Sequence, residues 1–161
     1  MEPSFKILLN SITTFIFDVD GVFTDGSVLV DDNGGLLRSM NIKDGYAVKV
    51  ALEKGYNVCI ITGGTNEGVL KRFTNLGVKH IFMGAHHKLT PLHQYFEAEN
   101  IAADQVLYMG DDLPDIPPMQ VVGLPSCPQD AVAEVKAASK YISHKKGGNG
   151  AVRDVIEQVL K

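Results

Sequence analysis

The chain has 161 residues, of which 45% are hydrophobic and 21% charged, and its formal net charge is −4 at pH 7. This length and hydrophobic content fit one globular domain over residues 1–161 with a buried core. A mild acidic excess without clustered basic residues argues against nucleic acid or an anionic membrane as a partner. No apolar run reaches the roughly 20 residues that a membrane helix needs. The first residues also lack the pattern of a secretory signal, so we expect a cytoplasmic protein.

Short apolar segments rich in β-branched residues recur along the chain and predict buried strands. They span residues 13–17, 58–61, 80–83, 106–109 and 141–143. Helical spacing predicts helices at residues 44–54, 67–76, 91–100 (with Thr90 as its cap) and 152–160. This alternation predicts an α/β fold, a Rossmann-like three-layer α/β/α parallel sheet that binds ligands at the carboxyl ends of its strands.

Three local features stand apart from the alternation. The turn signal DDNGG separates residues 27–30 from residues 36–41, and predicts a β-hairpin that projects between the first strand and the first helix. The glycine-rich stretch KKGGNG, residues 145–150, fits a mobile segment near the C-terminus. Cys59, in an apolar run, and Cys127, in an expected loop, have no metal-binding spacing and are interpreted as isolated thiols.

Acidic residues follow two of the predicted strands directly. Asp18 and Asp20 come after the first strand, and Asp111, Asp112 and Asp115 come after the strand at 106–109. Because the carboxyl ends of parallel strands share one sheet edge, these carboxylates should meet at a ligand crevice. Any single Asp could be an ordinary turn or cap residue. Two clusters at one edge repel unless a cation compensates, which predicts an oxygen-ligated Mg²⁺.

Two further positions fit an anion site. Thr62 ends the strand at 58–61 and precedes Gly63 and Gly64, which places a hydroxyl and bare backbone N–H groups where a phosphate oxygen could bind. Lys88, after the strand at 80–83, could supply a fixed positive charge. A solvated surface lysine is the alternative interpretation of this residue.

With these residues in order, the sequence resembles the haloacid dehalogenase superfamily, whose phosphatases carry DxDG, a strand-ending Thr or Ser, a Lys and DDxxD. DVDGVFTDG, NIKDGY, the hairpin and the ending GGNGAVRD are similar to capless members that dephosphorylate 3-deoxy-D-manno-octulosonate 8-phosphate. The resemblance implies a Mg²⁺-dependent phosphatase of lipopolysaccharide precursor synthesis without a cap domain. It also implies a homotetramer in which a neighbouring subunit completes the active site.

The resemblance implies a role for each residue of the site. Asp18 would be the nucleophile that forms an aspartyl-phosphate, and Asp20 would protonate the leaving hydroxyl and then activate water. Asp18, the backbone carbonyl of Asp20 and Asp111 would hold Mg²⁺. Thr62 and Lys88 would bind the transferring phosphoryl group, and Gly63 would lie beside them near the substrate.

Residues around this centre have supporting roles by the same resemblance. Asp112 and Asp115 would orient Lys88 or the waters of the metal ion. The candidates for binding the carboxylate of the substrate are basic side chains that could equally be solvated: Lys43, Arg72, Lys145 and Lys146.

Alternatives remain at two levels. Gly64 stands where relatives often carry a longer side chain and Met83 where they often carry Gln, so a phosphatase for a nine-carbon sugar acid 9-phosphate, of the KDN or N-acetylneuraminate type, is the closest alternative. A phospho-acceptor receiver domain and a binding or structural protein on the same fold are rivals of a different class. Asp18 and Asp20 favour an enzyme, because a proton-transfer partner stands two residues from the attacking group.

Overall fold

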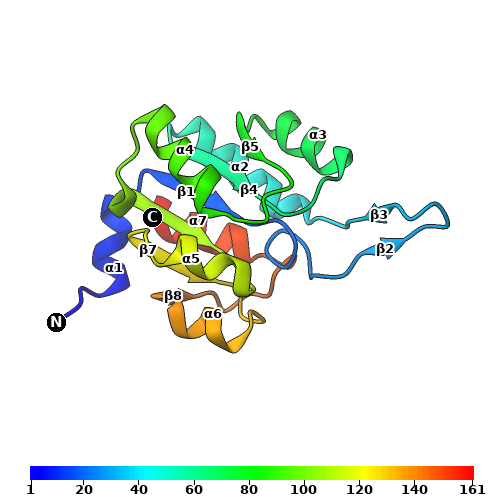
Figure 1. Cartoon of the computed structure of the whole chain (residues 1–161). Coiled ribbons are helices and arrows are strands. Elements are labelled where there is room, and N and C mark those ends of the chain that lie inside the picture. The colour runs from blue at the N-terminus through cyan, green and yellow to red at the C-terminus, as the bar shows by residue number, and fades with distance from the viewer.

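The computed structural model describes all residues, 1–161, and is built around a six-stranded parallel sheet (Figure 1). The strand order is β5-β4-β1-β6-β7-β8. The strands are β1 Thr14–Phe17, β4 Asn57–Ile61, β5 His80–Phe82, β6 Val106–Met109, β7 Leu124–Cys127 and β8 Tyr141–Ile142. β1 pairs with β4 on one side and with β6 on the other. Strands β4 and β5 therefore lie on one side of β1 and strands β6, β7 and β8 on the other, so the strand order reverses at β1. Open α/β sheets bind their ligands at such a switch point.

Helices cover both faces of the sheet and form two apolar cores. The helices are α1 Phe5–Leu8, α2 Ile42–Glu53, α3 Glu67–Leu76, α4 Leu89–Glu99, α5 Ile116–Met119, α6 Ala133–Ala138 and α7 Ala151–Leu160. Phe15 and Phe17 of β1 point to the core beneath α2, α3 and α7, whereas Ile16 points to the core beneath α4, α5 and α6. This alternation is the period of two that every strand imposes. The predicted three-layer α/β/α fold is therefore confirmed.

The principal elements begin and end within two residues of their predicted bounds, but β7 was not predicted. Cys127 therefore ends a buried strand, and its placement in a loop was wrong. The strand was missed because it contains Pro125. Proline has no backbone N–H for the hydrogen bonds between strands and is typical of edge strands, but β7 lies between β6 and β8. The predicted cap Thr90 was wrong as well: it lies inside α4, which begins at Leu89 after Lys88.

The glycine-rich stretch at residues 145–150 is held in place, so its interpretation as a mobile segment was wrong. The Gly148 N–H donates to the Val22 carbonyl at 3.0 Å, and the Gly147 N–H donates to Asp130 Oδ1 at 3.0 Å. The glycines permit this approach, because a side chain at Gly147 would collide with the backbone of Gly21. Helix α7 follows directly and buries its apolar face in the core.

The predicted hairpin is present and projects from the body of the molecule (Figure 1). Its strands, β2 Leu29–Val30 and β3 Leu36–Leu37, are shorter than predicted. The Asp31 carboxylate closes the turn by accepting hydrogen bonds from the N–H groups of Asn33 and Gly35. None of the helices in the structure has the length and apolarity to cross a bilayer.

Candidate active site

The predicted site residues meet at the carboxyl edge of the sheet. Asp18 follows β1, Thr62 follows β4 and Asp111 stands just beyond β6, while Lys88 precedes α4. They line a hollow of about 330 Å³ together with Asp20, Gly63, Asp112 and Asp115. All the predicted site residues except the four basic candidates for the substrate carboxylate thus come together, and His86 lines the same hollow although the sequence did not single it out.

Lys88 is the buried cation of this hollow. Its Nζ lies 3.1 Å from Asp18 Oδ1 and 2.7 Å from Asp115 Oδ1, with only 4% of its side chain exposed. Burial alone would lower the pKa of Lys88, but the two carboxylates together raise it above its ordinary value. The lysine therefore carries a fixed positive charge beside Asp18, and its alternative interpretation as a solvated surface lysine was wrong.

Asp115 uses both of its oxygens to hold neighbouring groups. Oδ1 accepts hydrogen bonds from Lys88 Nζ and from the Tyr108 hydroxyl at 2.6 Å. Oδ2 accepts from the N–H groups of Asp111 at 3.0 Å and Asp112 at 3.3 Å. Four donors occupy this carboxylate, so it orients Lys88 and the loop and has little capacity left to ligate a metal. Tyr108 was missed, since in the sequence it belongs to an apolar strand.

Asp18 and Asp111 are carboxylates without a full complement of positive charge. Burial, and then the nearby Asp115 carboxylate, raises the pKa of Asp18 well above its ordinary value. The same two causes raise the pKa of Asp111 to about 7. Lys88 touches Asp18 and Asp115, but no cation of the protein bonds to Asp111. The arrangement is therefore electrostatically incomplete at neutral pH.

A divalent cation fits this incomplete arrangement. Carboxylate oxygens of Asp18, Asp111 and Asp115 lie within 4.8 Å of one another. Because four donors already occupy Asp115, Asp18 and Asp111 are the two carboxylates that would ligate the ion. Three carboxylates and one ammonium leave two negative charges, which a hard ion such as Mg²⁺ would balance with oxygen ligands. A side chain at Gly21 would collide with the Asp111 carboxylate, so the glycine of the DxDG motif keeps this space open.

Thr62 presents its hydroxyl to the hollow. The Gly64 N–H donates to Thr62 Oγ1 at 3.2 Å, so the oxygen is already an acceptor and the hydroxyl hydrogen is left for a ligand. The predicted arrangement of a threonine followed by two glycines therefore forms a donor group that suits a phosphate oxygen.

Asp20 is held by a residue that the sequence analysis missed. Both oxygens of its carboxylate accept hydrogen bonds from the guanidinium of Arg38, with Nε–Oδ1 and Nη2–Oδ2 distances of 3.1 Å. Arg38 directly follows β3, so the hairpin brings it to the site. A single Arg between Leu37 and Ser39 carries no motif, and only the three-dimensional path of the hairpin reveals its partner.

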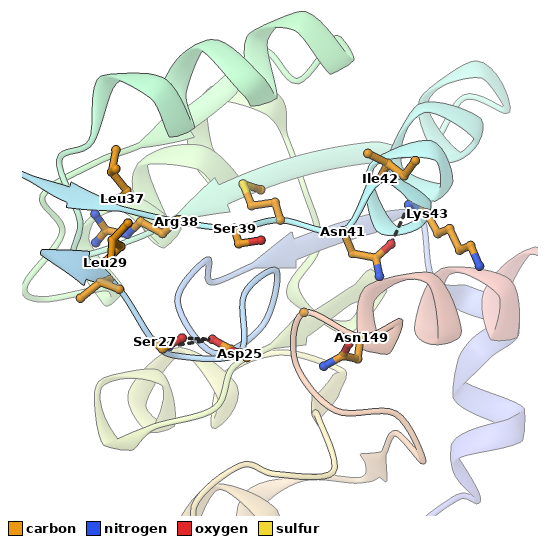
Figure 2. Close-up of a pocket in the computed structure, with 13 residues that line it drawn as sticks. Asp25, Ser27, Leu29, Leu37, Arg38, Ser39, Asn41, Ile42, Lys43 and Asn149 are labelled. Carbon is orange, nitrogen blue, oxygen red and sulfur yellow. Dashed lines mark hydrogen bonds between the residues drawn. The ribbon is translucent and has the colours of Figure 1, made fainter. Parts of the chain in front are cut away.

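The four basic candidates for a substrate carboxylate do not line the hollow at the sheet edge. A larger hollow of about 840 Å³ lies at the base of the hairpin. Lys43, at the start of α2, is one of the residues that line it (Figure 2). Arg72 lies in a separate depression beside Asn66 and Gly68. Lys145 lies near Arg153, and Lys146 is exposed. None of the four therefore borders the hollow of Asp18 within one chain, and their contact with the substrate stays a prediction.

Comparison with known proteins agrees with the fold. The sequence model of the haloacid dehalogenase-like hydrolases matches residues 80–156. The chain is 37% identical over 160 residues to 3-deoxy-D-manno-octulosonate 8-phosphate phosphatase of Salmonella typhimurium, a match covering 99% of this chain and 85% of that protein. The fold and the site thus define a haloacid dehalogenase-like hydrolase.

Solved structures narrow the assignment. The crystal structure of the phosphatase with the same substrate name from Yersinia pestis has a TM-score of 0.94 and 34% identity, covering 96% of this chain and 84% of that one. The enzyme from Moraxella catarrhalis was solved with magnesium ion, phosphate ion and KDO. Its structure has a TM-score of 0.93 and 33% identity, and the match covers 96% of this chain and 89% of that one. The chain belongs to the family of 3-deoxy-D-manno-octulosonate 8-phosphate phosphatases, which confirms the resemblance seen in its sequence and sets aside the receiver and structural alternatives.

Proposed function

We propose that this chain is a Mg²⁺-dependent phosphatase that hydrolyses 3-deoxy-D-manno-octulosonate 8-phosphate through an aspartyl-phosphate on Asp18. The observation that carries the proposal is the placement of Asp18, whose carboxylate is buried at the switch point of the sheet with Lys88 3.1 Å from one oxygen. The phosphatase names of the relatives and the sugar bound in one of them supply the substrate class.

In the first half-reaction, an oxygen of Asp18 attacks phosphorus and the bond from phosphorus to the sugar oxygen breaks. Asp20 gives its proton to that oxygen as it leaves, and Lys88 and the Thr62 hydroxyl bind the charge that develops on the phosphoryl oxygens. In the second half-reaction, Asp20 takes a proton from a water that attacks phosphorus, which releases phosphate and regenerates the Asp18 carboxylate.

Asp18, Asp111 and the backbone carbonyl of Asp20 would hold Mg²⁺ in this account. When bound, the ion supplies the positive charge that lets an anionic phosphate approach the carboxylates. Asp115 would keep Lys88 in place, as its four hydrogen bonds support. Asp112, exposed and bonded through Oδ1 to the Leu113 N–H, would shape the loop.

The proposal includes a homotetramer in the cytoplasm, in the synthesis of the sugar acid for lipopolysaccharide. Exposed apolar side chains on the hairpin support association: Leu29 is 68% exposed and Val30 is 64% exposed. An isolated two-stranded hairpin is marginally stable in water, so a partner surface would stabilise it. Lys43 or Lys145 of one subunit would then be available to the sugar carboxylate in the site of another.

A panel of sugar phosphates, assayed for phosphate release with Mg²⁺ and with EDTA, tests the proposal. We expect preference for the eight-carbon sugar acid 8-phosphate, loss of turnover in EDTA and recovery with Mg²⁺. The nine-carbon sugar acid 9-phosphates belong in the panel, since a preference for them would reassign the substrate while keeping the reaction. Undiminished turnover in EDTA would contradict the metal assignment.

A further inference from the structure

Arg38 and Asp20 form a two-armed ion pair that reaches from the hairpin into the site. The Nε–Oδ1 and Nη2–Oδ2 distances are both 3.1 Å, which is the fork-to-fork geometry of arginine and carboxylate. The Arg38 side chain is 8% exposed, whereas the Asp20 side chain is 38% exposed. The arginine is thus buried behind the carboxylate, and the carboxylate remains open to the hollow.

The guanidinium is held in this position from behind. Arg38 Nη1 donates to the Leu36 carbonyl at 3.0 Å, and the Asn66 side-chain amide donates to the same carbonyl at 2.8 Å. Asn66 itself caps α3, since its Oδ1 accepts a hydrogen bond from the Val69 N–H. The base of the hairpin is therefore fastened to the start of a core helix, and Arg38 cannot leave without breaking these contacts.

Gly64 leaves the space that Arg38 occupies. A Cβ at Gly64 would lie 3.2 Å from Arg38 Nη2, 3.6 Å from Thr62 Oγ1 and 3.7 Å from Asp20 Oδ2. The first distance is tighter than an ordinary van der Waals contact, so even an alanine would press on the guanidinium. Gly64, in the loop after β4, thus leaves room for the Arg38 guanidinium beside the site.

The Asp20 carboxylate has no hydrogen bond other than the two from Arg38. A group that transfers a proton to a leaving oxygen must be held within hydrogen-bond reach of it, and a small displacement is costly. We propose that Arg38 is the positioning residue of the reaction, fixing the Asp20 carboxylate on the leaving-group side of the phosphate site. This inference rests on the proposed role of Asp20, and Arg38 acts through Asp20 without itself touching the reacting atoms.

The test compares substrates that differ in their need for a proton. A sugar hydroxyl is a poor leaving group that must be protonated, whereas the phenolate of 4-nitrophenyl phosphate leaves unaided. For Arg38→Met we expect kcat/KM on the sugar phosphate to fall about 10- to 100-fold and kcat/KM on the aryl phosphate to change by about threefold at most. Arg38→Lys, which keeps the charge but has one point of contact, should recover part of the loss.

Two further variants keep the test decisive if Arg38→Met is poorly folded. Gly64→Ala displaces the guanidinium without removing it and should show the same selective loss in milder form. Lys79→Met, which removes an exposed cation just before β5, is the matched control and should leave both activities unchanged.

Equal losses on both substrates would overturn the inference, because Arg38 would then bind the phosphoryl group itself. An Arg38→Met enzyme with normal sugar phosphate turnover beside an inactive Asp20→Asn enzyme would also overturn it, while leaving the proposed function intact. A wild-type chain that releases phosphate from no sugar phosphate would refute the proposed function instead.

Discussion

The ammonium of Lys88 lies 3.1 Å from Asp18 Oδ1, so the carboxylate proposed to attack phosphorus is already paired with a buried cation. The second partner of that cation, Asp115, is completely buried. Asp18, Lys88 and Asp115 thus form one buried chain of ion pairs that lines the hollow. A substitution in it should change both the stability of the protein and its activity.

Replacing Lys88 with Met should destabilise the protein and abolish phosphate release. Removing one partner of a buried ion pair costs about 3–5 kcal/mol, because the remaining charge stays buried without compensation. Urea unfolding in EDTA, followed by circular dichroism, measures the free energy of unfolding. Lys49→Met, at an exposed position on α2, is the matched control. If the free energy of unfolding fell by the same amount in both variants, the buried ion pair would be contradicted.

The metal-free protein should lose stability as the pH rises from about 4 to about 7. The pKa of Asp111 is raised to about 7 in the folded chain, so the folded state keeps a proton that the unfolded state has already lost. Stability is therefore greatest at the acid end of this window and falls as Asp111 ionises. Mg²⁺ competes with that proton, so the rise in Tm on adding Mg²⁺ should be larger at pH 8 than at pH 5.5. Equal rises at both pH values would count against Asp111 as a ligand.

Asp111→Asn should separate stability from metal binding. It removes one of three mutually repelling carboxylates, so we expect the variant in EDTA at pH 7.5 to be at least as stable as the wild type. Its Tm should no longer respond to Mg²⁺, and its turnover should be lost. Asp112→Asn, a neighbouring exposed position, should keep both responses. Retention of the Mg²⁺ response by Asp111→Asn would place the ion elsewhere.

The hairpin should drive assembly. Light scattering should give about 70 kDa, four times the chain mass of 17.5 kDa. Leu29→Asp combined with Leu37→Asp places charge on paired, exposed positions and should lower this mass. Val121→Asp, the same kind of change away from the hairpin, should not. A wild-type mass near 17.5 kDa would refute the proposed tetramer.

Much of this architecture could be predicted from local patterns. Buried parallel strands read as continuous apolar runs, and their carboxyl ends place Asp18 and Asp111 side by side without any knowledge of side-chain positions. β7 escaped prediction because Pro125 contradicts the ordinary composition of an interior strand. Arg38 escaped because its importance comes from a contact with Asp20 across 18 residues, and no local pattern encodes that contact.

The conformation of Gly147 and Gly148 could not be predicted from the local sequence either. Glycine-rich sequence suggests freedom, yet here the absence of side chains allows the segment to pack against the backbone of Gly21 and Thr24. The same residue type can thus loosen a chain or permit its closest packing, and only the surrounding structure distinguishes the two.

The most direct test of the central claim is to trap the phosphorylated residue. Borohydride reduces an aspartyl-phosphate to homoserine, so wild-type enzyme quenched during turnover and digested for mass spectrometry should show homoserine at position 18 only when substrate and Mg²⁺ are present. Asp18→Asn should show none and should be inactive on sugar and aryl phosphates alike. Homoserine at another position, or near-normal turnover by Asp18→Asn, would contradict covalent catalysis at Asp18.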